Sequence, residues 1–194
     1  VTSIGANAFY GSNIEKIVFE PSANGLVIGN YAFYGCSQLK TIELPYGTTE
    51  IGSQAFQRSA LESIVLPDTV TKVGTTALAY MPNLKYVKLS AAMTEIPDRC
   101  FIEDTALEEI TLPASIRKCG MTNNLNAYDG CTSLKNIFVE EGSRYFKSVD
   151  GVLYDANGAT LRYYPEGKDD EKFTVPEGTI RIGARAFFGN EKLK

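Results

Sequence analysis

The stretch IGNYAFYGCSQLKTIELP, residues 28–45, decides the fold, because it returns with substitutions along the whole chain. Its clearest marker is an Ala-Phe pair, and successive copies of that pair are 24, 23, 22, 23, 27 and 59 residues apart. Self-similarity at a spacing of roughly 20 to 50 residues predicts a repeat solenoid, in which each copy forms one coil. The pair or a close substitute stands at Ala8-Phe9, Ala32-Phe33, Ala55-Phe56, Ala77-Leu78, Cys100-Phe101, Ala127-Tyr128 and Ala186-Phe187.

Each copy combines two local patterns. The I-x-L run before a proline alternates apolar and polar residues, which predicts a short strand with one buried face. The run G-x-x-A-F-x-x-C places Ala32 and Cys36 four residues apart, so we expect a short helical turn with both on one face. One coil is too small to bury its own apolar residues, and stacked coils bury them together. We therefore expect a first coil at residues 1–27, regular coils at 28–50, 51–72, 73–95 and 96–118, and an incomplete last coil.

Two smaller irregularities are expected to be surface loops. A loop at residues 20–25 leads into the second coil, and about four extra residues lie between Gly120 and Ala127. An insertion in a solenoid repeat usually becomes a loop on one face. We therefore expect Met121 to Asn126 to bulge from the side of the coil.

A larger departure from the repeat lies at residues 142–176. Here Val152 to Ala156 and Ala159 to Tyr164 read as two strands joined by Asn157-Gly158. An Asn-Gly pair tolerates the positive φ that a type I′ turn requires at both central positions. The sequence thus predicts a β-hairpin inserted between repeats of a single domain, residues 1–194. Because the chain opens and closes inside a repeat, we expect it to be a fragment of a longer protein.

The repeat I-G-x-x-A-F-x-x-C-x-x-L-x-x-I-x-L-P resembles the BspA-like, or Treponema pallidum-type, leucine-rich repeat. The inserted run F-K-S-V-D-G-V-L-Y, with L-x-x-Y-P-x-G-K after it (residues 146–168), is also similar to an element of those proteins. Proline stands where the commoner leucine-rich repeat has Asn or Cys after L-x-L, so an Asn ladder is not expected. The resemblance implies a curved, right-handed β/α superhelix. It also implies an exported or surface-attached bacterial protein that binds host proteins or other cells.

Composition excludes several classes of function. The net charge is −4, with Lys and Arg scattered among Asp and Glu, so no basic stripe for nucleic acid exists. No apolar run approaches the roughly 20 residues that a transmembrane helix needs. The oligomeric state and the identity of the partner are not encoded in any motif. The export signal and anchor that the resemblance implies are expected to lie outside this fragment.

The four cysteines fall on repeat positions that are otherwise apolar. Cys36 and Cys131 share one position, Cys100 stands where Ala is usual, and Cys119 where Ile is usual. Free Cys behaves as a small buried hydrophobe, so we expect free thiols in the core. A disulfide or metal site is the alternative, which the missing C-x-x-C spacing disfavours.

Catalytic constellations are missing from the sequence. There is no His, which excludes Ser-His-Asp and Cys-His sites in their usual forms. Glu108-Glu109 would point to opposite faces of a strand and cannot act jointly as acid and base. Asp155-Ala156-Asn157-Gly158 fits a hairpin turn better than a calcium loop. We expect no enzyme, no cofactor and no metal.

The exposed side of the I-x-L strands is the candidate site, because solenoids bind partners on such sheets. Val18, Val65 and Phe138 are apolar where a solvated strand would favour polar residues, and Tyr86 is a typical interface anchor. Ordinary β-propensity on a solvated strand is the alternative. The residues of this strand face are Lys16, Val18, Thr41, Glu43, Ser63, Val65, Tyr86, Lys88, Glu109, Thr111, Asn136 and Phe138.

The sequence thus predicts a non-catalytic adhesion module that binds a protein, expected to be a host extracellular or cell-surface protein, through the strand face or the hairpin. One alternative is a structural spacer that binds nothing specific. The other is a carbohydrate-binding module, in which four tyrosines of the insertion stack on sugar rings unless they simply pack the hairpin: Tyr145, Tyr154, Tyr163 and Tyr164.

Overall fold

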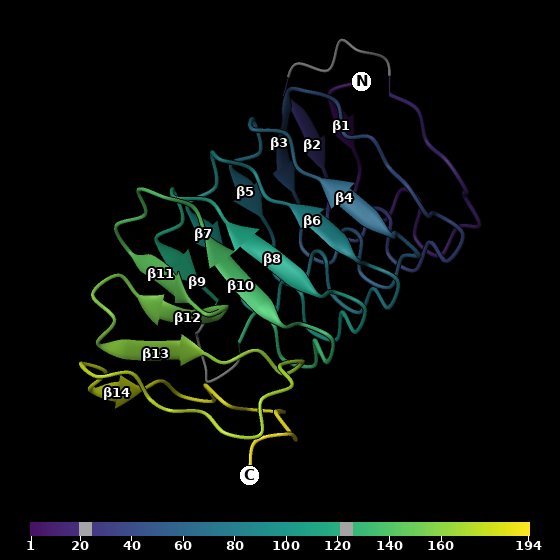
Figure 1. Ribbon diagram of the computed structural model, residues 1–194. Coiled ribbons are helices and arrows are strands. Elements are labelled where there is room, and N and C mark those ends of the chain that lie inside the picture. Colours follow the sequence, from purple (N-terminus) through teal and green to yellow (C-terminus); the bar gives the residue numbers. More distant parts are fainter. Residues whose placement is uncertain (20–24, 121–125) are drawn as a thin grey trace.

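The computed structural model describes residues 1–19, 25–120 and 126–194. Successive coils lie one behind another along a single axis, each contributing a segment to two stacks of short strands (Figure 1). This arrangement confirms the predicted repeat solenoid. Apart from Gly25 and Asn126, the two expected surface loops lie outside the described residues.

The first stack contains the residues that precede the repeat glycine. Its strands run parallel, in the order β1-β2-β3-β5 and, separately, β7-β9. The buried apolar residue of each coil aligns with that of the next, as in the pairs Ile4–Ile28 and Ile51–Val73. The strands are β1 (Ser3–Ile4), β2 (Leu26–Ile28), β3 (Thr48–Ile51), β5 (Lys72–Val73), β7 (Glu95–Ile96) and β9 (Lys118–Cys119).

The second stack contains the I-x-L segments. Its strands are β4 (Ser63–Val65), β6 (Tyr86–Lys88), β8 (Glu109–Leu112) and β10 (Asn136–Val139). They pair in parallel as β4 with β6 and β8 with β10. The corresponding segments of the first two coils, residues 17–19 and 42–44, were expected to be strands but are not part of any ladder.

The expected helical turns are wrong: the described residues contain no helix, so a β/α superhelix is not observed. Six of the seven Ala-Phe segments instead begin and end at a residue of positive φ, and the Ala127-Tyr128 segment ends at one; no right-handed helix accommodates such a residue. One such residue directly precedes the Ala position and the other follows it by three. The first set is Asn7, Tyr31, Gln54, Thr76, Arg99 and Arg185; the second is Gly11, Gly35, Arg58, Tyr80, Glu103, Gly130 and Gly189.

In this geometry, some backbone hydrogen bonds close turns within one coil and the others join neighbouring coils. Alternate N–H groups bond within the coil, as Tyr34 N does to Tyr31 O at 3.1 Å. The others bond to the next coil, as Phe33 N does to Ala55 O at 2.7 Å. A helix would satisfy its bonds internally, whereas here the turns themselves tie neighbouring coils together.

Apolar residues at repeat positions form one continuous core. Phe33 stacks on Phe9 and on Phe56, with ring centroids 5.1 and 5.2 Å apart, and Phe33 and Phe56 are fully buried. The four cysteines are free and buried, as predicted. Two of them add hydrogen bonds between coils, because the Cys36 thiol donates to Phe9 O and the Cys131 thiol to Phe101 O.

The insertion forms an antiparallel unit of β11 (Phe146–Val149), β12 (Val152–Asp155) and β13 (Thr160–Tyr163). The type I′ turn expected at Asn157-Gly158 is wrong, because only Gly158 has positive φ and its N–H bonds to Asp155 O. The pair with positive φ at both positions is Asp150-Gly151, between β11 and β12.

The inserted unit is built into the stack. Strand β13 pairs in parallel with β14 (Arg181–Ile182) of the last coil, and Gly183 N bonds to Leu161 O as Gly52 N does to Ile28 O. Across the insertion, the Arg185 guanidinium donates to the buried Asp129 carboxylate at 3.0 Å. The insertion therefore takes the place of a coil.

Candidate protein-binding face

The strand face exists as one surface along the second stack. Parallel pairing aligns Ser63 with Tyr86 and Val65 with Lys88. It also aligns Glu109 with Asn136 and Thr111 with Phe138. Of the twelve predicted residues, Ser63 and Asn136 are half-buried and the other ten are exposed. Lys16, Val18, Thr41 and Glu43 belong to the two coils whose segments are outside any ladder.

Large apolar side chains are exposed on this face. Val18 is 73%, Tyr86 54%, Val65 47% and Phe138 41% exposed. Their neighbours along the chain, Ile64, Val87 and Ile137, are buried, so the alternation predicted from the sequence holds in β4, β6 and β10. The face thus exposes two aromatic side chains, Tyr86 and Phe138, of the kind enriched at interfaces.

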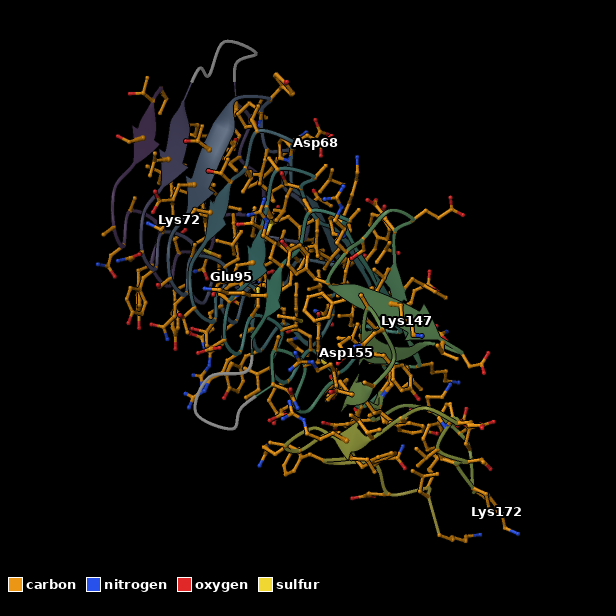
Figure 2. The ribbon with its side chains drawn as sticks, turned by 90° about the vertical axis from the view of Figure 1, so that its left-hand side faces the viewer. Asp68, Lys72, Glu95, Lys147, Asp155 and Lys172 are labelled. Atoms are coloured by element: carbon orange, nitrogen blue, oxygen red, sulfur yellow. The ribbon has the colours of Figure 1, made fainter. Side chains whose placement is uncertain are left out.

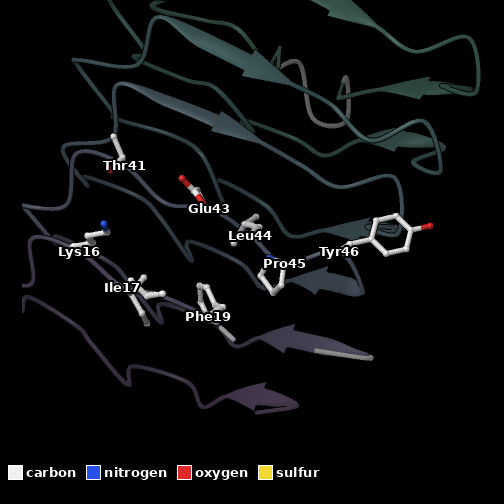
Figure 3. A pocket seen from close by; sticks show the side chains of 9 residues that line it. Lys16, Ile17, Phe19, Thr41, Glu43, Leu44, Pro45 and Tyr46 are labelled. Carbon is white, nitrogen blue, oxygen red and sulfur yellow. The ribbon is translucent and has the colours of Figure 1, made fainter. Parts of the chain in front are cut away.

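The strand face is also hollowed. A groove of about 420 Å³ lies between the first and second coils, where Lys16, Ile17 and Phe19 face Thr41 to Tyr46 (Figure 3). A second groove of about 420 Å³ separates the second and third coils, and a smaller one of about 90 Å³ lies between β6 and β8. The first two volumes fall within the range of ligand pockets, about 300–1,000 Å³.

Charged residues beside this face alternate in sign from one coil to the next. No single repeat motif reveals this pattern, which becomes visible only when the repeats are aligned. Neighbouring members lie on hydrogen-bonded coils, and Lys135 and Lys192 both form ion pairs with Asp169. The flank of the strand face is thus internally neutralised, which leaves little net charge to attract a partner from a distance. The series is Glu15, Lys40, Glu62, Lys85, Glu108, Lys135, Asp169 and Lys192.

A second alternating series follows the first stack. Glu50 forms an ion pair with Lys72 at 2.7 Å, and Glu95 aligns with Lys118 in the β7–β9 pair. Lys72 and Glu95 lie on successive coils of this surface (Figure 2). Opposite charges on neighbouring strands favour this stacking, and a shift by one coil would bring like charges together.

Asp104 is a fully buried acid of the core, and its charge acts on the Cys100 and Cys131 thiols. Its Oδ1 accepts a hydrogen bond from Met81 N at 2.7 Å, and no described protein group bonds to its Oδ2. Burial raises the pKa of this carboxyl well above its usual range, although the Met81 bond acts in the opposite direction. The carboxyl lies one coil from the Cys131 thiol, whose pKa is also raised by burial.

The Asp104 shift gives a prediction for pH dependence. Above the unfolded-state pKa of about 3.9, the unfolded chain releases this proton while the folded chain keeps it, so stability falls as pH rises toward the folded-state pKa. Asp104→Asn cannot ionise at this position. We expect the difference in free energy of unfolding between this variant and the wild type to favour the variant by about 1 kcal/mol or more at pH 8 compared with pH 4. Urea unfolding of both proteins across this range measures the difference. A difference that is constant with pH contradicts it.

The inserted unit presents less aromatic surface than the sequence allowed. Tyr154, Tyr163 and Tyr164 are each at most 1% exposed, and only Tyr145 of the four remains accessible. Tyr163 donates a hydrogen bond to Tyr128 O, and Tyr164 packs against Phe187 with ring centroids 5.0 Å apart. Packing of the insertion, rather than stacking on a sugar, therefore accounts for three of these tyrosines.

The described residues contain neither a metal-binding cluster nor a membrane-spanning helix. No group of three or more Cys, Asp or Glu side chains is placed to hold a metal ion. No helix among them is long and apolar enough to span a membrane.

Comparisons with known proteins identify the repeat. The BspA type leucine rich repeat region matches residues 2–135 in six copies. The crystal structure of the pneumococcal vaccine antigen PcpA is similar over the whole chain, with 34% identity and a TM-score of 0.82. A leucine rich cell surface protein of Faecalibacterium prausnitzii is 28% identical over the whole chain, with a TM-score of 0.69. The chain covers 49% and 57% of those two structures.

A leucine rich repeat protein of T. pallidum shares the fold over the whole chain, with a TM-score of 0.57 and 19% identity; the chain covers 79% of that structure. No curated protein matches the sequence. The family match covers well over half of the chain, and the repeats of the structure coincide with it. The chain is therefore a member of the BspA-type leucine-rich repeat family.

Proposed function

We propose that the chain is a non-catalytic protein-binding and adhesion module of an exported or cell-surface bacterial protein. Its partner is a host extracellular or cell-surface protein. Membership of a leucine-rich repeat family supports the protein-binding role. The similarity to a pneumococcal vaccine antigen and to a protein described as a cell surface protein supports the location. As the chain spans about half of those two structures, activities of the whole proteins are not carried over.

The strand face is the proposed contact surface. The observation that carries this choice is the exposure of two aromatic side chains, Tyr86 and Phe138, on strands that otherwise alternate regularly between buried and exposed residues. Interface energy concentrates in a few large side chains of this kind. The hairpin is the weaker candidate, because three of its four tyrosines, Tyr154, Tyr163 and Tyr164, are buried.

The test is alanine replacement of Tyr86 and of Phe138. We expect each change to weaken binding at least tenfold, a loss of about 1.4 kcal/mol, because each removes a large apolar contact without touching the core. Binding is measured by surface plasmon resonance against a panel of purified host extracellular-matrix proteins and receptor ectodomains.

Tyr145→Ala is the matched control, since Tyr145 is an aromatic residue of similar exposure that lies outside the strand face. Equal losses in all three variants, or none in the Tyr86 and Phe138 variants, would reject the strand face. If no member of the panel binds and longer chains self-associate, the spacer function replaces this proposal.

A further inference from the structure

The second and third coils separate along a bounded part of the strand face. Glu62 N bonds to Lys40 O at one end, and Thr69 Oγ1 bonds to Thr48 O at the other. Between these points, Thr41 to Leu44 make no backbone hydrogen bond to any described residue. Backbone groups held away from water are nearly always paired, so an extended segment without pairing has to open onto solvent or a partner.

The facing strand, β4, also directs free backbone groups into this gap. Leu66 N bonds to Lys88 O on the far side, toward β6. In a parallel ladder, alternate residues direct their N–H and C=O to opposite neighbours. Ser63 and Val65 therefore direct theirs away from β6, toward the second coil. Strand β4 is an edge strand, and such an edge is a template for pairing with another chain.

The gap is large enough to hold part of another chain. Its volume is about 420 Å³, compared with about 90 Å³ where β6 and β8 separate in the same way. Buried Ile42 and Ile64 and half-buried Leu44 supply apolar walls. Glu43 is the one charged side chain of the lining, and it forms no ion pair with any described residue.

We propose that this groove binds an extended segment of the protein partner, which adds to the free edge of β4 as a strand. Its backbone pairs with the N–H and C=O groups of Ser63 and Val65, and its apolar side chains lie against Ile42 and Leu44. A basic side chain of the segment pairs with Glu43, the unpaired charge of the groove. This inference rests on the proposed function and specifies the chemistry of the partner's contacting segment.

The test uses random dodecapeptides displayed on phage, selected on the whole chain, and then synthesised for fluorescence-anisotropy titration. We expect recovered peptides to be rich in β-branched residues and to carry Lys or Arg. We expect Val65→Pro to weaken their binding at least tenfold, because proline lacks the N–H that faces the groove yet is tolerated on an edge strand. Val65→Thr, which keeps that N–H, should bind within about threefold of the wild type.

Two further measurements keep the outcome decisive. Glu43→Gln should weaken the Lys- or Arg-bearing peptides several-fold at low salt, and less at high salt. In the wild type, amide hydrogen exchange should slow at Val65 when a selected peptide is added, while Ile64 is already protected by β6. This readout needs no variant and holds even if Val65→Pro fails to fold.

The inference is overturned if the selection yields no peptides, if they bind Val65→Pro as tightly as the wild type, or if Val65 exchange does not change. Failure of the groove and failure of the strand face remain distinguishable. A protein partner whose binding is lost with Tyr86→Ala and Phe138→Ala but kept with Val65→Pro preserves the strand face and removes the groove. If the partner binds all of these variants as tightly as the wild type, neither the strand face nor the groove is the contact surface.

Discussion

Gly74→Ala is expected to lower the free energy of unfolding by about 3 kcal/mol or more, the upper part of the range for an overpacked core. A Cβ on Gly74 would lie 2.3 Å from Ser53 N and 2.6 Å from Ser53 Cα, both backbone atoms of the preceding coil. A flexible side chain could move away, whereas this backbone is held by inter-coil hydrogen bonds such as Gly74 N to Ile51 O. Urea unfolding measures the change.

Gly5→Ala is the matched control for that prediction. Gly5 occupies the same repeat position, and nothing lies within 4 Å of the Cβ that would be added. Neither glycine has positive φ, so alanine is not strained by its backbone at either site. Where alanine fits, it stabilises by about 0.4–1 kcal/mol through the unfolded state. Similar effects of the two substitutions would show that backbone freedom, not contact between coils, explains the repeat glycine.

The same contact explains why the repeat position after the branched residue is so often glycine. At Gly29, Gly52 and Gly120 an added Cβ would lie 2.6–2.7 Å from backbone atoms of the preceding coil. The requirement comes from the neighbouring coil, which no single copy of the repeat reveals.

Repetition predicted the solenoid, the buried Phe stack and the free thiols, because each needs only the period and the apolar positions. The predicted helical turn was wrong because the four-residue spacing of Ala32 and Cys36 fits a helix and a chain of turns equally well. The deciding feature is positive φ at residues such as Tyr31, Gln54 and Arg58, which carry side chains and give no glycine signal. Hydrogen bonds to the next coil hold these residues in that conformation.

The insertion contains the predicted antiparallel pair of β12 and β13, but the type I′ turn was assigned to the wrong dipeptide. Asp150-Gly151 and Asn157-Gly158 are both strong hairpin signals, and the structure places the two-residue turn at the first. At the second pair, Asn157-Gly158, side-chain oxygens determine the conformation of the turn. Asp155 accepts a hydrogen bond from Thr160 N, and Asn157 accepts one from Ala159 N. These bonds favour a wider turn that the dipeptide alone does not specify.

The position of the strand face was predictable, and its hollows were not. Alternation of buried Ile64 and Leu66 with exposed Val65 follows from the period of a strand. The separation of Thr41 to Leu44 from β4 depends on how far neighbouring coils lie apart, and the I-x-L pattern is the same in coils that pair and coils that do not. Single-coil patterns carry no information on that distance.

Leu66→Asp should be the most damaging single change in the second stack, with an expected loss of about 4 kcal/mol or more. Leu66 is fully buried and belongs to the main hydrophobic core. Removing a buried leucine side chain costs about 2–5 kcal/mol, and an unpaired carboxylate adds a desolvation cost or must bind a proton. Single domains are stable by only about 5–15 kcal/mol, so this variant is expected to be largely unfolded at 37 °C.

Val65→Asp provides the comparison for this prediction, because it places the same carboxylate one residue earlier on the opposite side of β4. Val65 is 47% exposed, so its aspartate remains hydrated and should change stability by less than about 1 kcal/mol. Leu66→Ala extends the test if Leu66→Asp cannot be purified, with an expected loss of about 2–5 kcal/mol. Far-UV circular dichroism during urea unfolding measures all three variants. If Val65→Asp proves as harmful as Leu66→Asp, the two residues do not lie on opposite sides of the strand, and the stacked-coil core described here is contradicted.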